Sequence, residues 1–203
     1  MKISVISDTH NKHHDLNLVE SDILIVCGDF TNSSGKGIDL YNFDNWLGDI
    51  KHKFRSILVI KGNHEHNCYI NNLHLTNAYE MDGDYFEMDG VVFYGATYSD
   101  NFGVKEIIKN SFYPKIDVLI THYPPYGILD KWGHFNRGGS KKLLKDLLDL
   151  DPDFRPKHHV FGHIHEMSMK TIKKYGVKFI NASVCDPSYN LAKKEPIIIE
   201  INK

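Results

Sequence analysis

The sequence predicts an α/β fold in which two mixed β-sheets pack face to face with helices outside, a four-layer αββα sandwich. In its first part, short apolar strands alternate with amphipathic segments of helical spacing, the pattern typical of βαβ units. In its later part, alternating segments separated by short turns indicate antiparallel hairpins. No repeat, linker or low-complexity stretch divides the 203 residues, so we expect a single domain over residues 1–203.

Five short apolar stretches predict buried strands, and each of them leads directly into a polar loop. The stretches are residues 3–7, 22–27, 56–60, 117–120 and 159–161. The loops that follow carry Asp, Asn or His. Because the loops of an open α/β sheet converge at the carboxyl ends of its strands, we expect a functional site at that edge.

The remaining elements are two helices, two hairpins and a closing strand. Apolar residues at helical spacing predict both helices, and Ser140 is placed to cap the second one. An Asp-Gly and a Tyr-Gly pair mark the two turns. The helices are expected over residues 38–54 and 140–150, the hairpins over residues 85–94 and 169–180, and the strand over residues 196–201.

Composition excludes several classes of protein. A formal net charge of −2 gives no reason to expect binding to polyanions through net charge. No apolar run reaches the roughly 18 residues of a membrane span, and the amino-terminal segment meets Asp8 too early for a signal peptide. The three scattered cysteines favour buried thiols in a reducing compartment over a disulfide framework. We therefore expect a cytoplasmic protein without a membrane partner.

Thirteen histidines are many for this length, and their positions carry the functional argument. Gly-Asn-His and Gly-His-x-His are each expected by chance on the order of 0.1 times or less in such a chain. Both occur here, together with Asp-x-His and Gly-Asp, and each stands at the end of a predicted strand. The residues concerned are Asp8, His10, Asp29, Asn63, His64, His122, His163 and His165.

These side chains form a chemically consistent set of metal ligands. Oxygen and nitrogen ligands without thiolate suit Mn, Fe, Zn, Ni or Co. The two carboxylate oxygens of Asp29 could bridge two cations, and two cations roughly 3.5–4 Å apart can hold a hydroxide and clamp a phosphate. His64 follows Asn63 directly and is placed to act as a general acid or as a stabilising cation, with Glu65 a candidate to orient its ring.

The order of these motifs resembles that of the calcineurin-like metallophosphoesterases over essentially the whole chain. The resemblance implies their fold of two packed mixed sheets flanked by helices, and it implies two divalent metal ions. It also implies that His64 is the catalytic histidine. One metal would take Asp8, His10, Asp29 and His165, and the second would take Asp29, Asn63, His122 and His163.

A narrower resemblance links the chain to the brain-type metallophosphoesterase-domain proteins, which are similar in turn to class III cyclic-nucleotide phosphodiesterases. The motifs that carry it are residues 121–127, 162–166 and 180–185. Some brain-type members have Gly at the place of His163, which weakens their second metal site, whereas this chain keeps the histidine. It has Glu65 where many relatives have Asp.

Substrate contacts are predicted in the long loop over residues 123–139, which follows a ligand and is rich in Gly, Pro and aromatic residues. The loop is equally consistent with an irregular crossover to the second helix. If it binds substrate, Arg137 could pair with phosphate, and Trp132 or Tyr126 could stack on a base. His13 and His66 are also candidates for substrate contact because they are near the motifs in sequence, but they are weaker ones.

The predicted function is hydrolysis of phosphodiesters, cyclic nucleotides among them, or of small phosphomonoesters. A metal-bridging hydroxide would attack phosphorus while His64 assists the leaving group. One alternative is a nuclease, against which stands the lack of a basic stripe. Another is a non-catalytic protein-binding scaffold, against which stands the retention of His64, and a protein phosphatase is the third alternative. The sequence does not name the substrate, the metals or the oligomeric state.

Overall fold

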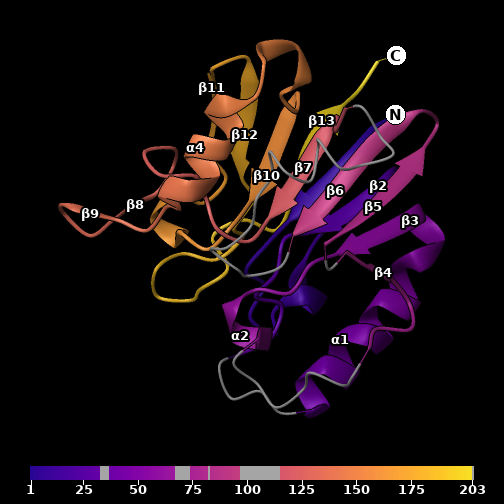
Figure 1. Ribbon diagram of the computed structural model, residues 1–203. Coiled ribbons are helices and arrows are strands. Elements are labelled where there is room, and N and C mark those ends of the chain that lie inside the picture. The colour runs from indigo at the N-terminus through magenta and orange to yellow at the C-terminus, as the bar shows by residue number, and fades with distance from the viewer. Residues whose placement is uncertain (33–36, 67–73, 82, 97–114, 203) are drawn as a thin grey trace.

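The computed structural model describes residues 1–32, 37–66, 74–81, 83–96 and 115–202. Two sheets pack face to face, with helices on their outer faces (Figure 1), so the predicted sandwich is confirmed. The first sheet has five strands. Their order is β13 (Ile197–Glu200), β1 (Lys2–Ile6), β2 (Ser21–Val26), β3 (Phe54–Val59) and β4 (Tyr79–Glu80).

The second sheet has six strands and contains both predicted hairpins. Asp89 (φ 50°) and Gly90 (φ 73°) turn the first hairpin, while Tyr175 (φ 53°) and Gly176 (φ 81°) turn the second, as tight hairpin turns require. The strand order is β11 (Thr171–Lys174), β12 (Val177–Asn181), β10 (His158–Phe161), β7 (Val118–Thr121), β6 (Val91–Ala96) and β5 (Asp84–Met88).

Alternation of side chains along the strands divides the apolar core into three layers. Ile23 and Ile25 of β2 face the space between the sheets, whereas Leu24 and Val26 face outward. Helix α1 (Gly37–Ile50) covers that outward face, and helix α4 (Lys141–Asp149) covers the outer face of the six-stranded sheet. The hydroxyl oxygen of Ser140 accepts a hydrogen bond from the backbone N–H of Leu143, as predicted for an N-cap.

The first helix is shorter than the sequence predicts. Helix α1 ends at Ile50, a 3-10 turn η2 covers Lys51–Lys53, and Phe54 already pairs with Ser21 in the parallel ladder between β3 and β2. The side chain of Phe54 nevertheless packs against the apolar cluster to which the buried residues of helix α1 belong. This shared packing explains why Phe54 has the spacing of a helical residue.

Short elements complete the described fold and surround the strand ends. The helical turns are η1 (His13–Asp15), α2 (Asn63–His66), η3 (Pro152–Phe154) and η4 (His165–Met167), and β8 (Lys131–Trp132) pairs with β9 (Asn136–Arg137) in a small separate hairpin. The predicted long loop over residues 123–139 therefore contains regular structure. In the described ranges no helix is long and apolar enough to cross a membrane. Cys27 and Cys185 are buried free thiols, while Cys68 lies outside the described residues.

The two sheets are joined at the carboxyl ends of their parallel strands. Directly after β1, the N–H of Ser7 donates to the carbonyl of Ala182 (2.9 Å), and the carbonyl of Ser7 accepts from the N–H of Val184 (3.0 Å). Strands β1, β2 and β3 run parallel to one another, as do β7, β10 and β12. The polar loops of both sheets consequently meet at one edge of the sandwich.

His159 of β10 is fully buried against Phe161 and Phe179. Burial lowers the pKa of His159 to about 3, from an ordinary value of 6.5. Between these values the unfolded chain binds a proton that the folded chain does not, so stability is lost as the pH falls from 6.5 towards 3. The slope of this contribution approaches about 1.4 kcal/mol per pH unit.

We expect His159→Gln to flatten the acid limb of the stability profile by that amount. Gln keeps a donor for Thr121, whose hydroxyl lies 2.8 Å from Nε2 of His159. Urea unfolding of the metal-free protein in EDTA at a series of pH values measures this slope. Parallel profiles for wild type and variant would show that His159 does not titrate as its burial requires.

Candidate metal centre

Four of the predicted ligands have left-handed backbone conformations. Their φ angles are 54° for Asp8, 42° for His10, 51° for Asp29 and 69° for His163. Residues with a side chain rarely adopt this region, and the strain is retained where the surrounding structure enforces it, often at functional sites. Each of these residues follows a strand, so the strained backbone turns its side chain back towards the sheet edge.

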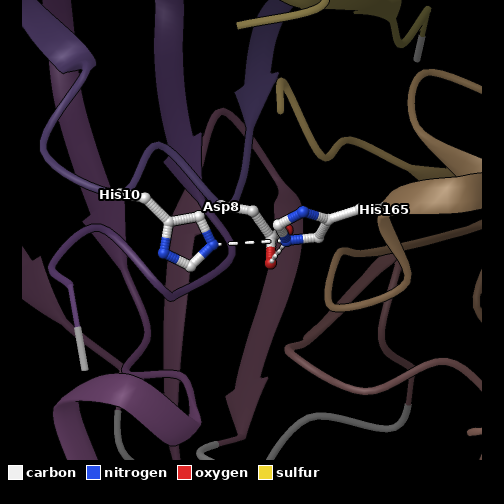
Figure 2. Close-up of side chains that lie close together, drawn as sticks. All are labelled: Asp8, His10 and His165. Atoms are coloured by element: carbon white, nitrogen blue, oxygen red, sulfur yellow. Dashed lines mark hydrogen bonds and ion pairs between the residues drawn. The ribbon is translucent and has the colours of Figure 1, made fainter. Parts of the chain in front are cut away.

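The first group of side chains consists of Asp8, His10 and His165, which converge in Figure 2. One ligand atom from each lies within 4.8 Å of the others. The Nε2 atoms of His10 and His165 are 3.2 Å apart, and Nε2 of His165 is 3.3 Å from Oδ1 of Asp8. All three side chains are largely buried, so water competes little for these atoms.

The hydrogen bonds of the two rings fix which nitrogen atom faces this group. Nδ1 of His10 donates to the carbonyl of Thr31 (3.1 Å), and Nδ1 of His165 donates to the carbonyl of Asp186 (2.9 Å). A carbonyl oxygen only accepts, so each Nδ1 carries the hydrogen and Nε2 of the neutral ring bears a lone pair. Two lone pairs 3.2 Å apart repel each other unless one nitrogen is protonated or a metal ion binds both. The arrangement therefore fits a metal ion.

The second group consists of Asp29, His122 and His163, with the amide of Asn63 beside them. Nδ1 of His122 donates to the carbonyl of Cys27 (2.7 Å). Its Nε2 atom lies 3.0 Å from Oδ1 of Asn63 and 3.2 Å from Oδ2 of Asp29. Two oxygen atoms and one imidazole nitrogen thus face one another, a mixed set of ligands that again suits a divalent cation.

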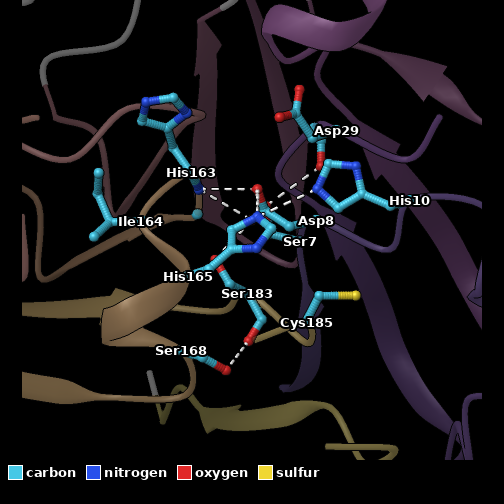
Figure 3. Close-up of polar contacts among 12 residues, drawn as sticks. Ser7, Asp8, His10, Asp29, His163, Ile164, His165, Ser168, Ser183 and Cys185 are labelled. Atoms are coloured by element: carbon cyan, nitrogen blue, oxygen red, sulfur yellow. Dashed lines mark hydrogen bonds and ion pairs between the residues drawn. The ribbon is translucent and has the colours of Figure 1, made fainter. Parts of the chain in front are cut away.

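The carboxylate of Asp8 is fully buried and held by three hydrogen bonds (Figure 3). The backbone N–H of His163 lies 3.1 Å and 3.0 Å from its two oxygens, and the hydroxyl of Ser183 donates to Oδ2 (2.7 Å). Sequence reasoning missed Ser183 as a site residue, although it belongs to a quoted motif. These bonds orient the carboxylate and link the loops after β10 and β12 to the loop after β1.

The electrostatics keep the carboxylates ionised in the metal-free site. Burial opposes ionisation of Asp8, but the hydrogen bond and charge of His165 and the charges of His122 and His10 lower its pKa overall. For His10 burial dominates and lowers the pKa to about 4, despite the nearby carboxylates. Burial likewise lowers the pKa of His163 to about 4. These two imidazoles are neutral at pH 7, as metal ligands must be.

His122 differs because its ring is protonated on both nitrogens at neutral pH. Burial lowers its pKa, but the charge of Asp29 and its hydrogen bond outweigh burial and raise the pKa to about 9. The proton occupies the position at which Nε2 faces the carboxylate (3.2 Å). A cation bound there would replace this proton, so metal binding by this group releases a proton.

Glu65 of α2 has a structural role that differs from the prediction. Its buried carboxylate accepts hydrogen bonds of 2.8 Å from the backbone N–H groups of Asp29, Gly62 and Thr31 and from the hydroxyl of Thr31. It therefore fastens the loops after β2 and β3 together and does not orient the ring of His64. Burial first, and then the charge of Asp29, raise the pKa of Glu65 to about 7.

His64 and both ligand groups border one open cavity of about 250 Å³. The backbone N–H of His64 donates to Oδ1 of Asp29 (2.9 Å), and its Nε2 lies 3.7 Å from Oδ2 of the same carboxylate. Tyr189, which sequence reasoning missed, also lines the cavity, and its ring centroid lies 4.6 Å from that of His10 and 5.1 Å from that of His165. The polar Asp-Pro-Ser-Tyr turn after β12 is the sequence signal that points to it.

The residues predicted to contact substrate do not lie together in the structure. Trp132 lines the metal cavity, whereas Arg137 and Tyr126 line a second hollow. His13 is buried against Phe43 and Trp46 of α1, so the expectation that it contacts substrate is wrong. His13 is near the metal-ligand motifs in sequence, but its side chain belongs to the apolar packing under α1. The side chain of His66 lies outside the described residues.

Comparison with known proteins places this geometry in context. Residues 1–167 match the profile of the calcineurin-like phosphoesterases. A UPF0046 protein of Caenorhabditis elegans is 31% identical over 237 residues, which cover 100% of this chain and 76% of that protein. Metallophosphoesterase domain-containing protein 1 of Homo sapiens is 29% identical over 242 residues, which cover 97% and 69%. The phosphopantetheinyl hydrolase of Mycobacterium tuberculosis has the same fold, with a TM-score of 0.57, 16% identity and coverage of 93% and 90%.

Gly62 provides a test of the proposed ligand geometry that replaces none of the proposed ligand residues. A Cβ atom at this position would overlap Oδ1 of Asp29 and its backbone nitrogen. We expect Gly62→Ala to displace Asp29 and to weaken Mn²⁺ binding by about 10–100-fold, the range found when groups that support metal ligands are changed. Isothermal titration calorimetry measures the affinity.

Gly48→Ala is the matched control, because the atoms nearest to a Cβ atom at Gly48 would be those of the Asn77 side chain, at 3.3 Å. Its affinity for Mn²⁺ should equal that of the wild type. Equal affinity in the Gly62 variant would mean that Asn63 and Asp29 do not depend on this close approach of the two loops.

Proposed function

We propose, since this chain belongs to the calcineurin-like phosphoesterase family, that it hydrolyses phosphoesters with the aid of two divalent cations. One observation carries the proposal. Two groups of converging ligands, each suited to a cation, border the same cavity as His64. A cavity that combines metal ligands with a group able to transfer a proton is what phosphoester hydrolysis requires.

Each cation would be held by one of the two groups. Asp8, His10 and His165 would hold the first, and Asn63, His122 and His163 the second, with Asp29 shared between them. Bound divalent cations supply Lewis-acid activation of water and of the phosphoryl group. Mn, Fe, Zn, Ni and Co all suit this ligand set.

His64 is the group best placed to handle the proton of the leaving oxygen. It lies at the amino end of α2, where its backbone N–H donates to Oδ1 of Asp29. Its ring edge faces His10, with centroids 4.7 Å apart, and it lines the open cavity. An imidazole at this border can donate a proton to a departing alkoxide, which is too basic to leave unprotonated.

The size and walls of the cavity favour a small substrate. About 250 Å³ accommodates a phosphoryl group and a compact organic group. Trp132 and Tyr189 are half-exposed aromatic side chains at its border and provide flat apolar surfaces. We therefore propose small phosphodiesters, cyclic nucleotides among them, or small phosphomonoesters as the substrate class.

The first test compares hydrolysis of bis-p-nitrophenyl phosphate by Mn²⁺-loaded wild type and His64→Asn. We expect kcat to fall by about 10²–10⁴-fold, the usual contribution of a positioned general acid, with Mn²⁺ affinity retained. Asp29→Ala should lose both activity and metal. The exposed His52 provides the control, and His52→Asn should behave as the wild type. Undiminished hydrolysis by both site variants would refute the proposal.

A second test concerns the hydroxyl of Tyr189, which has no hydrogen-bond partner among the described residues. Burial and the charges of Asp29 and Asp8 raise its pKa, so it remains a neutral donor that can reach a phosphoryl oxygen. Tyr189→Phe should lower kcat/KM by roughly 2–13-fold, equivalent to a net hydrogen bond of about 0.5–1.5 kcal/mol, without changing Mn²⁺ affinity.

Tyr175→Phe removes a hydroxyl from another partly exposed tyrosine, in the turn between β11 and β12, and should leave kcat/KM unchanged. Identical kinetics for wild type and Tyr189→Phe would show that the hydroxyl does not contact substrate.

A further inference from the structure

A second hollow, larger than the metal cavity, lies between the β8–β9 hairpin and the start of α4. Its volume is about 680 Å³. We call it the basic hollow, and it is lined by Tyr123, Tyr126 and residues 135–142. The lining contains three cationic side chains, those of Arg137, Lys141 and Lys142, and no carboxylate. The metal cavity, by contrast, is bordered by two acidic residues, Asp29 and Glu166.

Two of the three cations are concentrated at one aromatic ring. The guanidinium carbon of Arg137 lies 5.6 Å from the ring centroid of Tyr126, and the ammonium nitrogen of Lys141 lies 5.3 Å from it. Lys142 pairs with Asp146 of α4 (2.9 Å), whereas Lys141 has no ion pair within the described ranges. Since Arg137 pairs with Asp130, Lys141 is the cation of the hollow without a paired carboxylate in the described ranges, and a bound anion would supply its counter-charge.

Arg137 is held in place from behind by a buried carboxylate. Its Nη1 donates to Oδ1 of Asp130 (2.7 Å), and Asp130 is fully buried. The other oxygen of Asp130 accepts from the backbone N–H of Gly127 (2.8 Å). The guanidinium is thereby oriented through one nitrogen, and its other N–H groups have no partner among the residues that the structure describes. A fixed fork of donors is the usual means of binding phosphate or carboxylate.

The basic hollow and the metal cavity share a wall. The ring of Tyr123, which lines the hollow, lies 4.0 Å from the ring of His163, which lines the cavity. Trp132 of the β8–β9 hairpin also borders the metal cavity. The two recesses are thus separated by a single ring–ring contact, and a phosphoester long enough to span it would contact both.

We infer that the basic hollow binds a second anionic group, such as a second phosphate, on the phosphoester that the metal cavity holds. Arg137 and Lys141 would contact this group, with Tyr126 beneath them. The identification of the ligand as a phosphoester rests on the proposed function. The binding of an anion in the basic hollow does not depend on it. The inference narrows the substrate class to phosphoesters that carry a further negative charge away from the scissile bond.

The test measures anion binding without metal or turnover. Radiolabelled pyrophosphate is equilibrated by dialysis against the full chain in EDTA at constant ionic strength. We expect saturable binding to the wild type, and at least tenfold weaker binding to the double variant Arg137→Gln/Lys141→Gln. The control Lys145→Gln/Lys173→Gln removes the same charge outside the hollow, from α4 and β11, and should bind within about twofold of the wild type.

Because Arg137→Gln also removes the contact with Asp130, the single variant Lys141→Gln is measured as well, and about threefold weaker binding is expected. Wild-type protein that binds no pyrophosphate, or variants that bind it as well as the wild type and the control, would overturn the inference while leaving the proposed hydrolysis untouched. Intact pyrophosphate binding together with no Mn²⁺-dependent hydrolysis would overturn the proposed function and leave the anion site in place.

Discussion

The whole site depends on three imidazole rings that donate a hydrogen bond through Nδ1 to a main-chain carbonyl. The pairs are His10 with Thr31, His122 with Cys27 and His165 with Asp186. Each bond fixes both the orientation of the ring and the hydrogen on Nδ1, so Nε2 is the nitrogen that faces the shared interior and can bind a cation when the ring is neutral. Because the carbonyls belong to segments that follow strands, the backbone that ends the strands also determines which nitrogen is available.

The same strand ends hold the carboxylates in conformations that an isolated chain would avoid. Asp8 and Asp29 both have positive φ angles, and the cost of order 1–3 kcal/mol each is balanced by contacts between loops that are distant in sequence. Glu65 fastens the loops after β2 and β3, and the hydrogen bonds of Ser7 join the two sheets. Glycines are required where these loops approach one another, since a Cβ atom at Gly162 would overlap Asp8. Stability of the sandwich and geometry of the ligands are therefore coupled.

The two recesses divide the chemistry between them. The metal cavity gathers carboxylates, imidazoles and aromatic rings, whereas the basic hollow gathers cations around Tyr126. Tyr123 and His163 form the wall between the recesses, so a proposed metal ligand contacts a side chain of the hollow. Under the proposed function, this arrangement would select a substrate by the distance between its two charged groups.

The sequence alone determined the class of fold, the hairpins, the cap of the second helix and which polar side chains converge at the strand ends. It could do so because side-chain periodicity and the residues that end each strand are local properties. Tertiary structure decided the rest. Glu65 binds backbone groups of two loops, His13 is buried under α1, and Tyr189 reaches the cavity from a turn near the end of the chain. Those roles depend on contacts between distant segments, which no local pattern encodes, because packing and the pairing of buried polar groups are settled only when the two sheets come together.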